Sequence, residues 1–302
     1  MRVIFMGTPD YASRILERLL AVETIEVVAA YTQPDKPVGR KKVMTPPPVK
    51  EVALAHAIPV YQPEKLRDEA VVTELRTIAC DYIVVAAYGQ ILPKSVLDHA
   101  PCINLHASIL PQYRGASPIQ QTLLNGDKET GVTAMLMEEG LDTGDIIKIA
   151  RIDVPGDEMV TTLFERLTDL AAELTVDVLE HFGDYTPVPQ NDAEATHCKK
   201  ITKADGEVAF EEAQTLYNKY RAFTPWPGVY LESGLKLKAM ACESEEGEHL
   251  PGTILVIDAD SAVIGCAKGT LRLFSVQPPS KNEMSVVDYL NGKRLSVADR
   301  LA

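Results

Sequence analysis

Three polar side chains stand at spacings suited to the transfer of an acyl-type group to an amine. Asn104 and His106 are two residues apart in the run 102–107, which reads as a strand, so their side chains share one face. Asp142 follows later in the chain and is bracketed by glycines, as expected of a carboxylate carried on a tight loop. The three together offer an amide, an imidazole and a carboxylate.

Such a transfer needs a neutral attacking nitrogen, a stabilised oxyanion and a route for the proton that leaves the nitrogen. Asn104 can donate to the developing oxyanion, and His106 can donate as well or carry the proton. Asp142 can orient the imidazole and favour its protonated form, or accept the proton directly or through a water. The sequence leaves open whether His106 or Asp142 takes the proton. No serine or cysteine nucleophile is needed, because the amine itself attacks.

The elements that must position these residues alternate between strand-like and helix-like in the first half of the chain. This alternation predicts an α/β fold with an open, mostly parallel sheet and helices on both faces. Ligands bind such sheets outside the carboxyl ends of the strands, where Asn104 and His106 fall. The expected strands are 2–7, 25–32, 59–62, 82–88, 102–107, 131–137 and 146–153. The expected helices are 12–22, 49–56, 68–78 and 160–182.

The composition changes after Gly183. Residues 184–205 are rich in proline and polar side chains and show little periodicity, which is typical of a linker. Residues 206–302 then carry short strand-like runs with Gly and Asp turns, which predict a small β-barrel or sandwich domain. We therefore expect a first domain over 1–183. The expected second-domain elements are a helix near 211–222 and strands 228–232, 235–242, 252–257, 262–266 and 269–277.

The bulk composition limits the class of protein. Net charge is −13 over 302 residues, so any contact with nucleic acid must depend on a local basic patch. Five scattered cysteines predict no disulfide framework and no zinc site, and we expect no metal. No apolar run is long enough to cross a membrane, and Met1 leads directly into a strand rather than a secretion signal. These features favour a cytoplasmic protein.

Several of these motifs together resemble the folate-dependent formyltransferases. They are Asn-x-His, the loop Ser108-Ile109-Leu110-Pro111, Arg114-Gly115 and the Leu-Asp-Thr-Gly motif around Asp142. The resemblance implies a Rossmann-like first domain, catalysis by Asn104, His106 and Asp142, and 10-formyltetrahydrofolate as the formyl donor. It also implies that the four residues Ser108, Ile109, Leu110 and Pro111 contact the folate. Ile109 replaces the first leucine of the family's Ser-Leu-Leu-Pro and is a conservative change.

The family includes enzymes that act on a glycinamide nucleotide, on aminosugar nucleotides and on methionyl-tRNA, and an insert distinguishes among them. The segment 33–48 contains Gln-Pro-Asp-Lys-Pro-x-Gly-Arg and is similar to the tRNA-specific branch. From Asp35 to Glu51 there are five basic residues against two acids. Prolines and Gly39 predict an irregular, mobile, positive loop that follows phosphates or enters an RNA groove. The tRNA contacts expected from it are Arg40, Lys41 and Lys42.

The resemblance extends over essentially the whole chain and implies that the second domain is an OB-like barrel that helps bind tRNA. Residues 205–302 carry ten basic and fourteen acidic side chains, so their positive residues must gather on one face. In this part of the chain, the basic residues expected to contact tRNA are Lys200 and Lys203. Further candidates are Lys199, Lys236, Lys238, Lys293 and Arg294.

The leading hypothesis is transfer of a formyl group to the α-amino group of methionyl initiator tRNA by a monomer with no protein partner and no membrane contact. A sugar-nucleotide N-formyltransferase with the same catalytic centre is the nearest alternative. A non-catalytic RNA-binding module is another, which the charge of −13 disfavours. A dehydrogenase is weaker still, since Gly7-Thr8-Pro9-Asp10 follows the first strand without a Gly-x-Gly-x-x-Gly motif.

Overall fold

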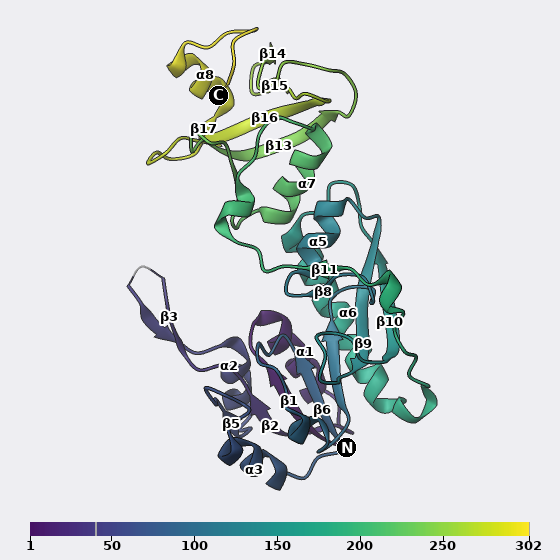
Figure 1. Cartoon of the computed structure of the whole chain (residues 1–302). Coiled ribbons are helices and arrows are strands. Elements are labelled where there is room, and N and C mark those ends of the chain that lie inside the picture. The colour runs from purple at the N-terminus through teal and green to yellow at the C-terminus, as the bar shows by residue number, and fades with distance from the viewer. Residues whose placement is uncertain (40, 302) are drawn as a thin grey trace. The chain divides into compact units, whose positions relative to one another are not determined.

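The computed structural model describes residues 1–39 and 41–301, which divide into two compact units (Figure 1). Unit 1 comprises Met1–Pro118, Glu129–Val154 and Thr162–Cys198. Unit 2 comprises Ile119–Lys128, Pro155–Thr161 and the chain from Lys199 onward. Each unit is therefore assembled from segments that are distant in sequence.

Unit 1 is built on a seven-stranded, mostly parallel sheet. The central strands are parallel, whereas β9 runs antiparallel to β7 and β10 runs antiparallel to β9. In spatial order the strands are β10 (Ile146–Asp153), β9 (Glu129–Leu136), β7 (Cys102–His106), β6 (Tyr82–Ala86), β1 (Arg2–Gly7), β2 (Glu26–Tyr31) and β5 (Val60–Tyr61). The predicted α/β class and the positions of all seven strands are confirmed.

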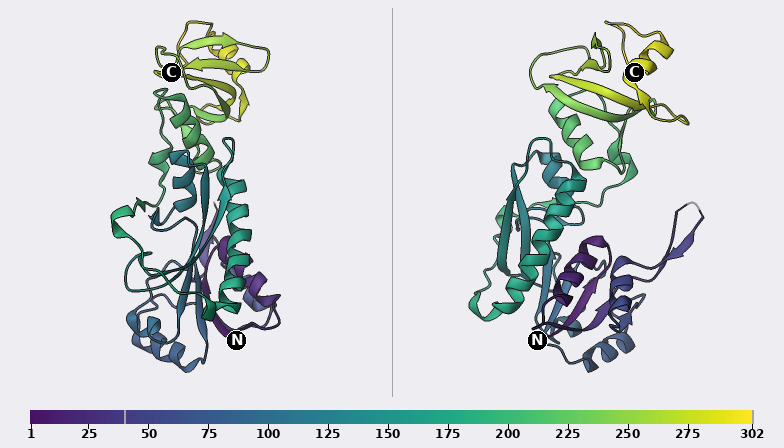
Figure 2. Two further views of the ribbon diagram at one scale, coloured as in Figure 1. Left: turned by 90° about the vertical axis from the view of Figure 1, so that its right-hand side faces the viewer. Right: turned by 180° about the vertical axis from the view of Figure 1, so that it is seen from behind.

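Helices cover both faces of this sheet (Figure 2). The helices are α1 (Asp10–Leu20), α2 (Pro48–Ala55), α3 (Glu69–Thr77), α4 (Lys94–Leu97) and α6 (Val160–Glu180). Helix α1 lies beside α6. Arg14 of α1 forms a salt bridge with Asp169 of α6 at 2.6 Å, and Arg18 forms one with Glu173 at 2.8 Å. Helices α3 and α4 contribute to the apolar cluster on the opposite face, where they meet alternate residues of β1. The continuous apolar runs of the central strands follow from this burial on two sides.

The basic insert after β2 is a two-stranded hairpin, so the prediction of an irregular loop is wrong. Strand β3 (Lys36–Val38) pairs antiparallel with β4 (Val43–Thr45). The reason is that proline favours extended backbone and is tolerated in edge strands, where Pro37 stands opposite Met44. Positive φ angles at Gly39 and Lys42 reverse the chain between the strands. Figure 1 shows this hairpin extending away from the sheet of unit 1.

Unit 2 contains a six-stranded antiparallel sheet, confirming a second, β-rich part of the chain. Its strands are β12 (Val229–Tyr230), β13 (Lys236–Ser244), β16 (Thr270–Gln277), β15 (Ala262–Gly265) and β14 (Ile254–Ile257), with β17 (Met284–Ser285) beside β16. Its helices include α5 (Pro118–Asn125), which begins in unit 1, α7 (Ala213–Phe223) and α8 (Val286–Lys293). Closure of the sheet into an OB-like barrel stays a prediction.

The buried face of α7 links the segments that make up unit 2. Arg221 is only 3% exposed; it donates to Asn218 at 2.6 Å and to the carbonyl of Glu158 at 3.3 Å, and lies over the ring of Tyr217. Asn218 also donates to the carbonyl of Leu124 in α5. These contacts fix α5 and the loop 155–161 to the C-terminal part of the chain.

Among residues 1–39 and 41–301, no helix has the length and apolar character needed to cross a lipid bilayer.

Candidate functional site

Asn104 and His106 are the last polar side chains of β7, at the carboxyl end of that strand. All five residues of β7 are buried, and it pairs with β6 on one side and with β9 on the other. Asn104 lies opposite Met135 and His106 opposite Thr133 on β9. The two side chains share one face, as the two-residue spacing predicts.

Asp142 reaches these two side chains from the loop between β9 and β10. Its Oδ1 lies 3.4 Å from Nδ2 of Asn104, which donates to it, and 3.7 Å from Nδ1 of His106. Its Oδ2 accepts a hydrogen bond of 2.9 Å from the backbone amide of Gly115. The side chains of His106 and Asp142 are only 7% and 12% exposed. The structure thus brings the three residues singled out from the sequence into one largely buried cluster.

The hydrogen bond at the far side of the imidazole fixes its tautomer. Nε2 of His106 lies 2.9 Å from the carbonyl oxygen of Tyr113. A carbonyl oxygen only accepts, so Nε2 carries a proton and Nδ1 of the neutral ring is the free acceptor. That free nitrogen is the one that faces Asp142. A proton taken up at Nδ1 therefore arrives beside a carboxylate that stabilises the imidazolium.

Gly115 brings its backbone amide to Asp142 through a close approach between two chain segments. Strand β8 (Arg114–Gly115) pairs with β11 (His197–Cys198). Gly115 has φ +121°, and a Cβ atom there would lie 2.3 Å from the carbonyl oxygen of Cys198. Any side chain at this position would push the two strands apart. Glycine is therefore required for the Gly115–Asp142 hydrogen bond.

The thiol of Cys198 lies where β8 and β11 meet, and it makes two hydrogen bonds. It donates to the carbonyl of Tyr113 at 3.4 Å and accepts from the amide of Ser117 at 3.3 Å. Burial raises the pKa of this thiol, and the negative charge of Asp142 adds to the effect. Cys198 is therefore a neutral packing group rather than a nucleophile.

The loop Ser108-Ile109-Leu110-Pro111 follows β7 directly, and Thr133 of β9 holds it. The hydroxyl of Thr133 donates to the carbonyl of Ser108 at 2.7 Å and accepts from the amide of Leu110 at 3.1 Å. The Ser108 hydroxyl donates to the carbonyl of Gln112 at 2.6 Å and is completely buried, as Leu110 nearly is. Ile109 and Pro111 are partly exposed. Ser108 and Leu110 shape this loop, which leaves Ile109 and Pro111 as its accessible side chains.

Two further residues, Gln190 and Arg114, support this site, although the sequence predicts no individual role for either. Gln190 donates to the backbone carbonyls of Asp142 and Gly144, and Arg114 donates to Gln190. Gln190 falls in the stretch 184–205, whose proline content and weak periodicity gave no sign of contact with the Asp142 loop. Arg114 was recognised only as part of a family motif.

Two of the three basic residues expected to contact tRNA from unit 1 belong to the β3–β4 hairpin. Lys41 and Lys42 lie in its turn and are exposed, while Arg40 lies outside the described residues. A fourth basic residue, Lys50, is not free: it binds both oxygens of Asp35 at 2.8 Å. Val38, Val43 and Met44 of the hairpin are more than half exposed. The hairpin therefore presents both positive and apolar side chains to solvent.

The remaining basic candidates lie in unit 2. Lys200 and Lys203 are exposed, and Lys203 begins a short 3-10 turn (Lys203–Gly206) closed by a capping box between Thr202 and Asp205. Lys236 and Lys238 lie on β13, where Lys236 is exposed and Lys238 is partly exposed at a shift in the strand register between Leu237 and Ala239. Lys199, Lys293 and Arg294 are exposed as well.

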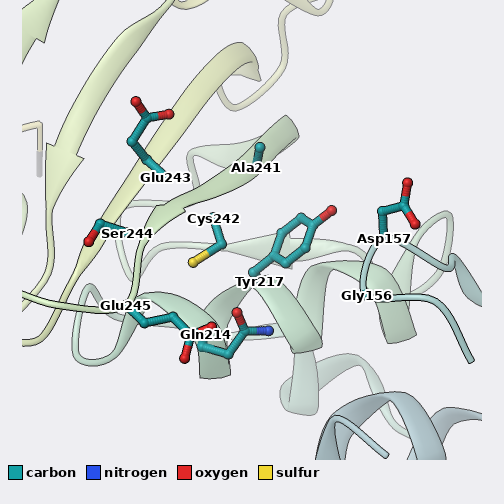
Figure 3. Close-up of a pocket in the computed structure, with 9 residues that line it drawn as sticks. All are labelled: Gly156, Asp157, Gln214, Tyr217, Ala241, Cys242, Glu243, Ser244 and Glu245. Atoms are coloured by element: carbon teal, nitrogen blue, oxygen red, sulfur yellow. The ribbon is translucent and has the colours of Figure 1, made fainter. Parts of the chain in front are cut away.

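A cavity of about 390 Å³ in unit 2 has the wrong charge for a phosphate backbone (Figure 3). Asp157, Glu243 and Glu245 line it together with Tyr217 and Cys242, from β13, α7 and the loop 155–161. Glu243 is paired with Arg272 at 2.8 Å. Burial and the nearby glutamates raise the pKa of the Cys242 thiol, so it stays neutral. The cavity shares no residue with the Asn104, His106 and Asp142 cluster.

Within the described parts of the chain, 1–39 and 41–301, no group of three or more His, Cys, Asp or Glu side chains is placed to hold a metal ion.

Comparison with known proteins identifies the class to which this fold and site belong. Residues 1–179 match the formyl transferase family, and residues 200–294 match the formyl transferase C-terminal domain. The chain is 63% identical over 302 residues to the methionyl-tRNA formyltransferase of Sulfurimonas denitrificans, covering 100% of both chains. It is 56% identical over 301 residues to that of Nitratiruptor, covering 99% of both. The chain therefore belongs to the formyl transferase family, among the methionyl-tRNA formyltransferases.

A solved structure of lower sequence identity supports the fold. The N-formyltransferase from Helicobacter canadensis, in complex with folinic acid and dTDP-3-aminofucose, superposes with a TM-score of 0.67. The match covers 91% of this chain and 99% of that chain, at 16% identity. At this identity the likeness extends to the fold alone.

Proposed function

We propose that this protein transfers the formyl group of 10-formyltetrahydrofolate to the α-amino group of methionyl initiator tRNA. The observation that carries the proposal is the convergence of Asn104, His106 and Asp142 in one buried cluster, with Nδ1 of His106 as the free acceptor. The high identity to methionyl-tRNA formyltransferases over the full chain supports the choice of acceptor. The enzyme acts as a monomer in the cytoplasm, without a protein partner, and requires no metal.

The amine attacks the formyl carbon, which gives a tetrahedral intermediate with a negative oxygen. Nδ2 of Asn104 donates to that oxygen, which is more favourable in a buried site than in water because competing solvent is excluded. The amine gives up a proton, the bond from the formyl carbon to N10 of the folate breaks, and N10 gains a proton. No covalent enzyme intermediate forms.

His106 carries the proton in this scheme, with Asp142 as its charge partner. Nδ1 of His106 accepts the proton from the attacking amine, and Oδ1 of Asp142 lies 3.7 Å away to stabilise the imidazolium. The same proton is then available for the leaving N10. The bond from Nε2 to the carbonyl of Tyr113 keeps the ring in one orientation throughout.

The folate binds beside the loop Ser108-Ile109-Leu110-Pro111. Ile109 and Pro111 offer partly exposed apolar surface in the loop that follows β7 and His106, which suits the flat aromatic part of the donor. Ser108 and Leu110 are buried beneath this surface and maintain the conformation of the loop. The Helicobacter canadensis relative of the same fold was solved with folinic acid, a formylated folate, which is consistent with this donor class.

The tRNA is bound by basic side chains in both units. Arg40, Lys41 and Lys42 of the segment 33–48 contact the phosphate backbone, and Lys200 and Lys203 contribute from unit 2. The domain expected over residues 1–183 carries the catalytic cluster, the stretch 184–205 adds Gln190 to it, and the domain expected over 206–302 is the OB-like tRNA-binding domain. The net charge of −13 makes local clustering of these residues essential.

Formylation of aminoacylated initiator tRNA tests this function directly. Purified protein with 10-formyltetrahydrofolate is expected to yield formyl-methionyl-tRNA, and Asn104→Ala is expected to be about 10²–10³-fold slower. A dTDP-linked aminosugar offered in place of tRNA is expected to remain unmodified. Formylation of the sugar but not of the tRNA, or equal activity of wild type and Asn104→Ala, would refute the proposal.

A further inference from the structure

The side-chain amide of Gln190 joins the Asp142 loop to a buried arginine. Its Nε2 donates to the backbone carbonyl of Asp142 at 2.9 Å and to that of Gly144 at 2.8 Å. Its Oε1 accepts from Nε and Nη2 of Arg114 at 3.1 and 2.8 Å. These four bonds use both donors and both lone pairs of the amide. All of these residues belong to unit 1.

The chemistry of the partners fixes the orientation of this amide. If oxygen and nitrogen were exchanged, the oxygen would face two carbonyls and the NH₂ group would face a guanidinium, so every contact would be repulsive. Arg114 is 4% exposed, and its Nη2 also binds Asp192 at 2.8 Å, whose side chain is 83% exposed. The guanidinium is therefore anchored by two partners and offers Gln190 a fixed donor pair.

The loop that Gln190 binds needs support, because Asp142 has φ +55°. This left-handed conformation is unfavourable for a residue with a side chain and persists only where the surroundings impose it. The amide of Gly115 and the side chain of Asn104 hold the carboxylate of Asp142, and Gln190 holds its backbone carbonyl. Asp142 is thus restrained at its side-chain carboxylate and at its backbone carbonyl.

We propose that Gln190 is a positioning residue for the formyl transfer. By binding the carbonyls of Asp142 and Gly144 it keeps the Asp142 carboxylate in place beside His106. This inference rests on the proposed function, since it concerns the rate at which the same site reacts. Gln190 touches neither the reacting atoms nor the substrates in this scheme, so its effect passes through Asp142.

Two substitutions separate this role from simple structural support. Gln190→Glu keeps the shape and the bonds from Arg114, but it directs a carboxylate oxygen at two carbonyl oxygens and repels the Asp142 loop. Gln190→Leu loses both sets of bonds without adding repulsion. If Gln190 served only to satisfy Arg114, the glutamate would be the milder change and the leucine the more damaging.

We expect the reverse order for kcat. A displacement of about 1 Å in a catalytic group can slow a reaction about 10²-fold. Gln190→Glu should therefore lower kcat by about 10²-fold and Gln190→Leu by about 10-fold, with KM for tRNA and for the folate within about twofold of wild type. Asn282→Asp makes the same amide-to-acid change at an exposed position of unit 2 and should retain wild-type kcat.

The experiment is steady-state formylation by the full chain, with both KM values measured and thermal unfolding recorded for each variant. A lower kcat for Gln190→Glu than for Gln190→Leu at unchanged KM supports the positioning role. The opposite order, equal activities, or a change in KM alone overturns it. If Gln190→Glu does not fold, wild-type kcat in Gln190→Leu overturns the inference and a tenfold loss at unchanged KM supports it. An inactive wild type would instead refute the proposed function.

Discussion

Oδ1 of Asp142 lies 3.7 Å from Nδ1 of His106, the one ring nitrogen that its neighbours leave free to accept a proton. The other nitrogen donates to the carbonyl of Tyr113, so the imidazole can exchange protons only on the side that faces the carboxylate. This relationship bears on the two proton carriers that the sequence leaves open. It favours His106 as the carrier and Asp142 as the charge that stabilises it.

The substitution Asp142→Asn should remove that charge and keep the shape. The oxygen of the new side-chain amide can still accept from the backbone amide of Gly115, whereas its NH₂ group takes the place of Oδ1 and loses the 3.4 Å bond from Asn104. Without a carboxylate to stabilise the imidazolium, we expect kcat to fall by about 10²–10⁴-fold. Single-turnover formylation of methionyl-tRNA measures this loss. The matched control is Glu139→Gln, a change at an exposed position of the same loop, which should retain kcat. If Asp142→Asn raised KM and left kcat unchanged, the role assigned to Asp142 would be contradicted.

Replacement of Gly115 by alanine should affect stability and activity together. The new Cβ would lie 2.3 Å from the carbonyl oxygen of Cys198 at φ +121°, so β8 and β11 must separate. Such strain costs about 1–3 kcal/mol, and separation also withdraws the amide from Asp142. We expect a lower Tm and a kcat reduced at least tenfold.

The control for this change is Gly156→Ala, where a Cβ meets no atom within 4 Å. That variant should match wild type in denaturant midpoint and in formylation rate. If the alanine at Gly115 were equally harmless, the close approach of the two strands would not be what holds the amide against Asp142.

Local patterns in the sequence were sufficient to predict the central strands and the position of the candidate site. The runs 2–7, 82–88 and 102–107 are apolar because those strands are buried on both faces, and they correspond to β1, β6 and β7. The alternation along 102–107 placed Asn104 and His106 on one face. Both inferences depend only on residues close together in the chain.

Contacts between distant segments could not be predicted in the same way. The bond from Gln190 to the Asp142 loop joins residues 48 apart, and nothing near Gln190 in the sequence indicates it. The β3–β4 hairpin was missed because its prolines argue against regular structure, whereas an isolated two-stranded edge tolerates them. Helix α8 was missed too, although Ser285 caps it by accepting from the amide of Asp288, a signal that was present in the sequence.

Removal of the three consecutive positive charges at Arg40, Lys41 and Lys42 should weaken tRNA binding. The triple variant Arg40→Ala, Lys41→Ala and Lys42→Ala is expected to raise KM for methionyl-tRNA at least tenfold, because phosphate contacts dominate such affinity. It should leave kcat at saturating tRNA and KM for the folate unchanged. The salt dependence of the tRNA KM should also become shallower, by about one unit of slope per lost phosphate contact.

The matched control removes three exposed basic residues from another surface of unit 1, as Lys65→Ala, Arg67→Ala and Arg76→Ala. It changes the net charge equally, so any general electrostatic effect appears in both variants. An equal rise in KM for the two would show that the hairpin has no special role and that only the total charge matters.

The base of the hairpin is anchored by Asp35, and this anchor should make the stability of the protein depend on pH. Asp35 accepts from Lys50 at 2.8 Å and from Gln62 at 2.7 Å. Bonds from Gln62 and Lys50 hold the pKa of this carboxyl below its usual range. Its stabilising effect is therefore complete above the unfolded pKa of about 3.9 and is lost as pH falls through the lower, folded value.

Asp35→Asn should abolish this contribution, because an amide lacks the charge that binds Lys50. The variant is expected to have a lower Tm than wild type at neutral pH, and the difference should shrink as pH falls below about 3.9. At neutral pH its KM for methionyl-tRNA should rise about two- to tenfold, since a loosened hairpin binds at a greater cost in conformational entropy. Asp68→Asn, at the start of α3 with no side-chain cap bond, should match wild type in both measurements. A Tm difference that grows at low pH would show that the carboxyl is not stabilised in its charged form, and an unchanged KM would show that the anchor has no part in binding tRNA.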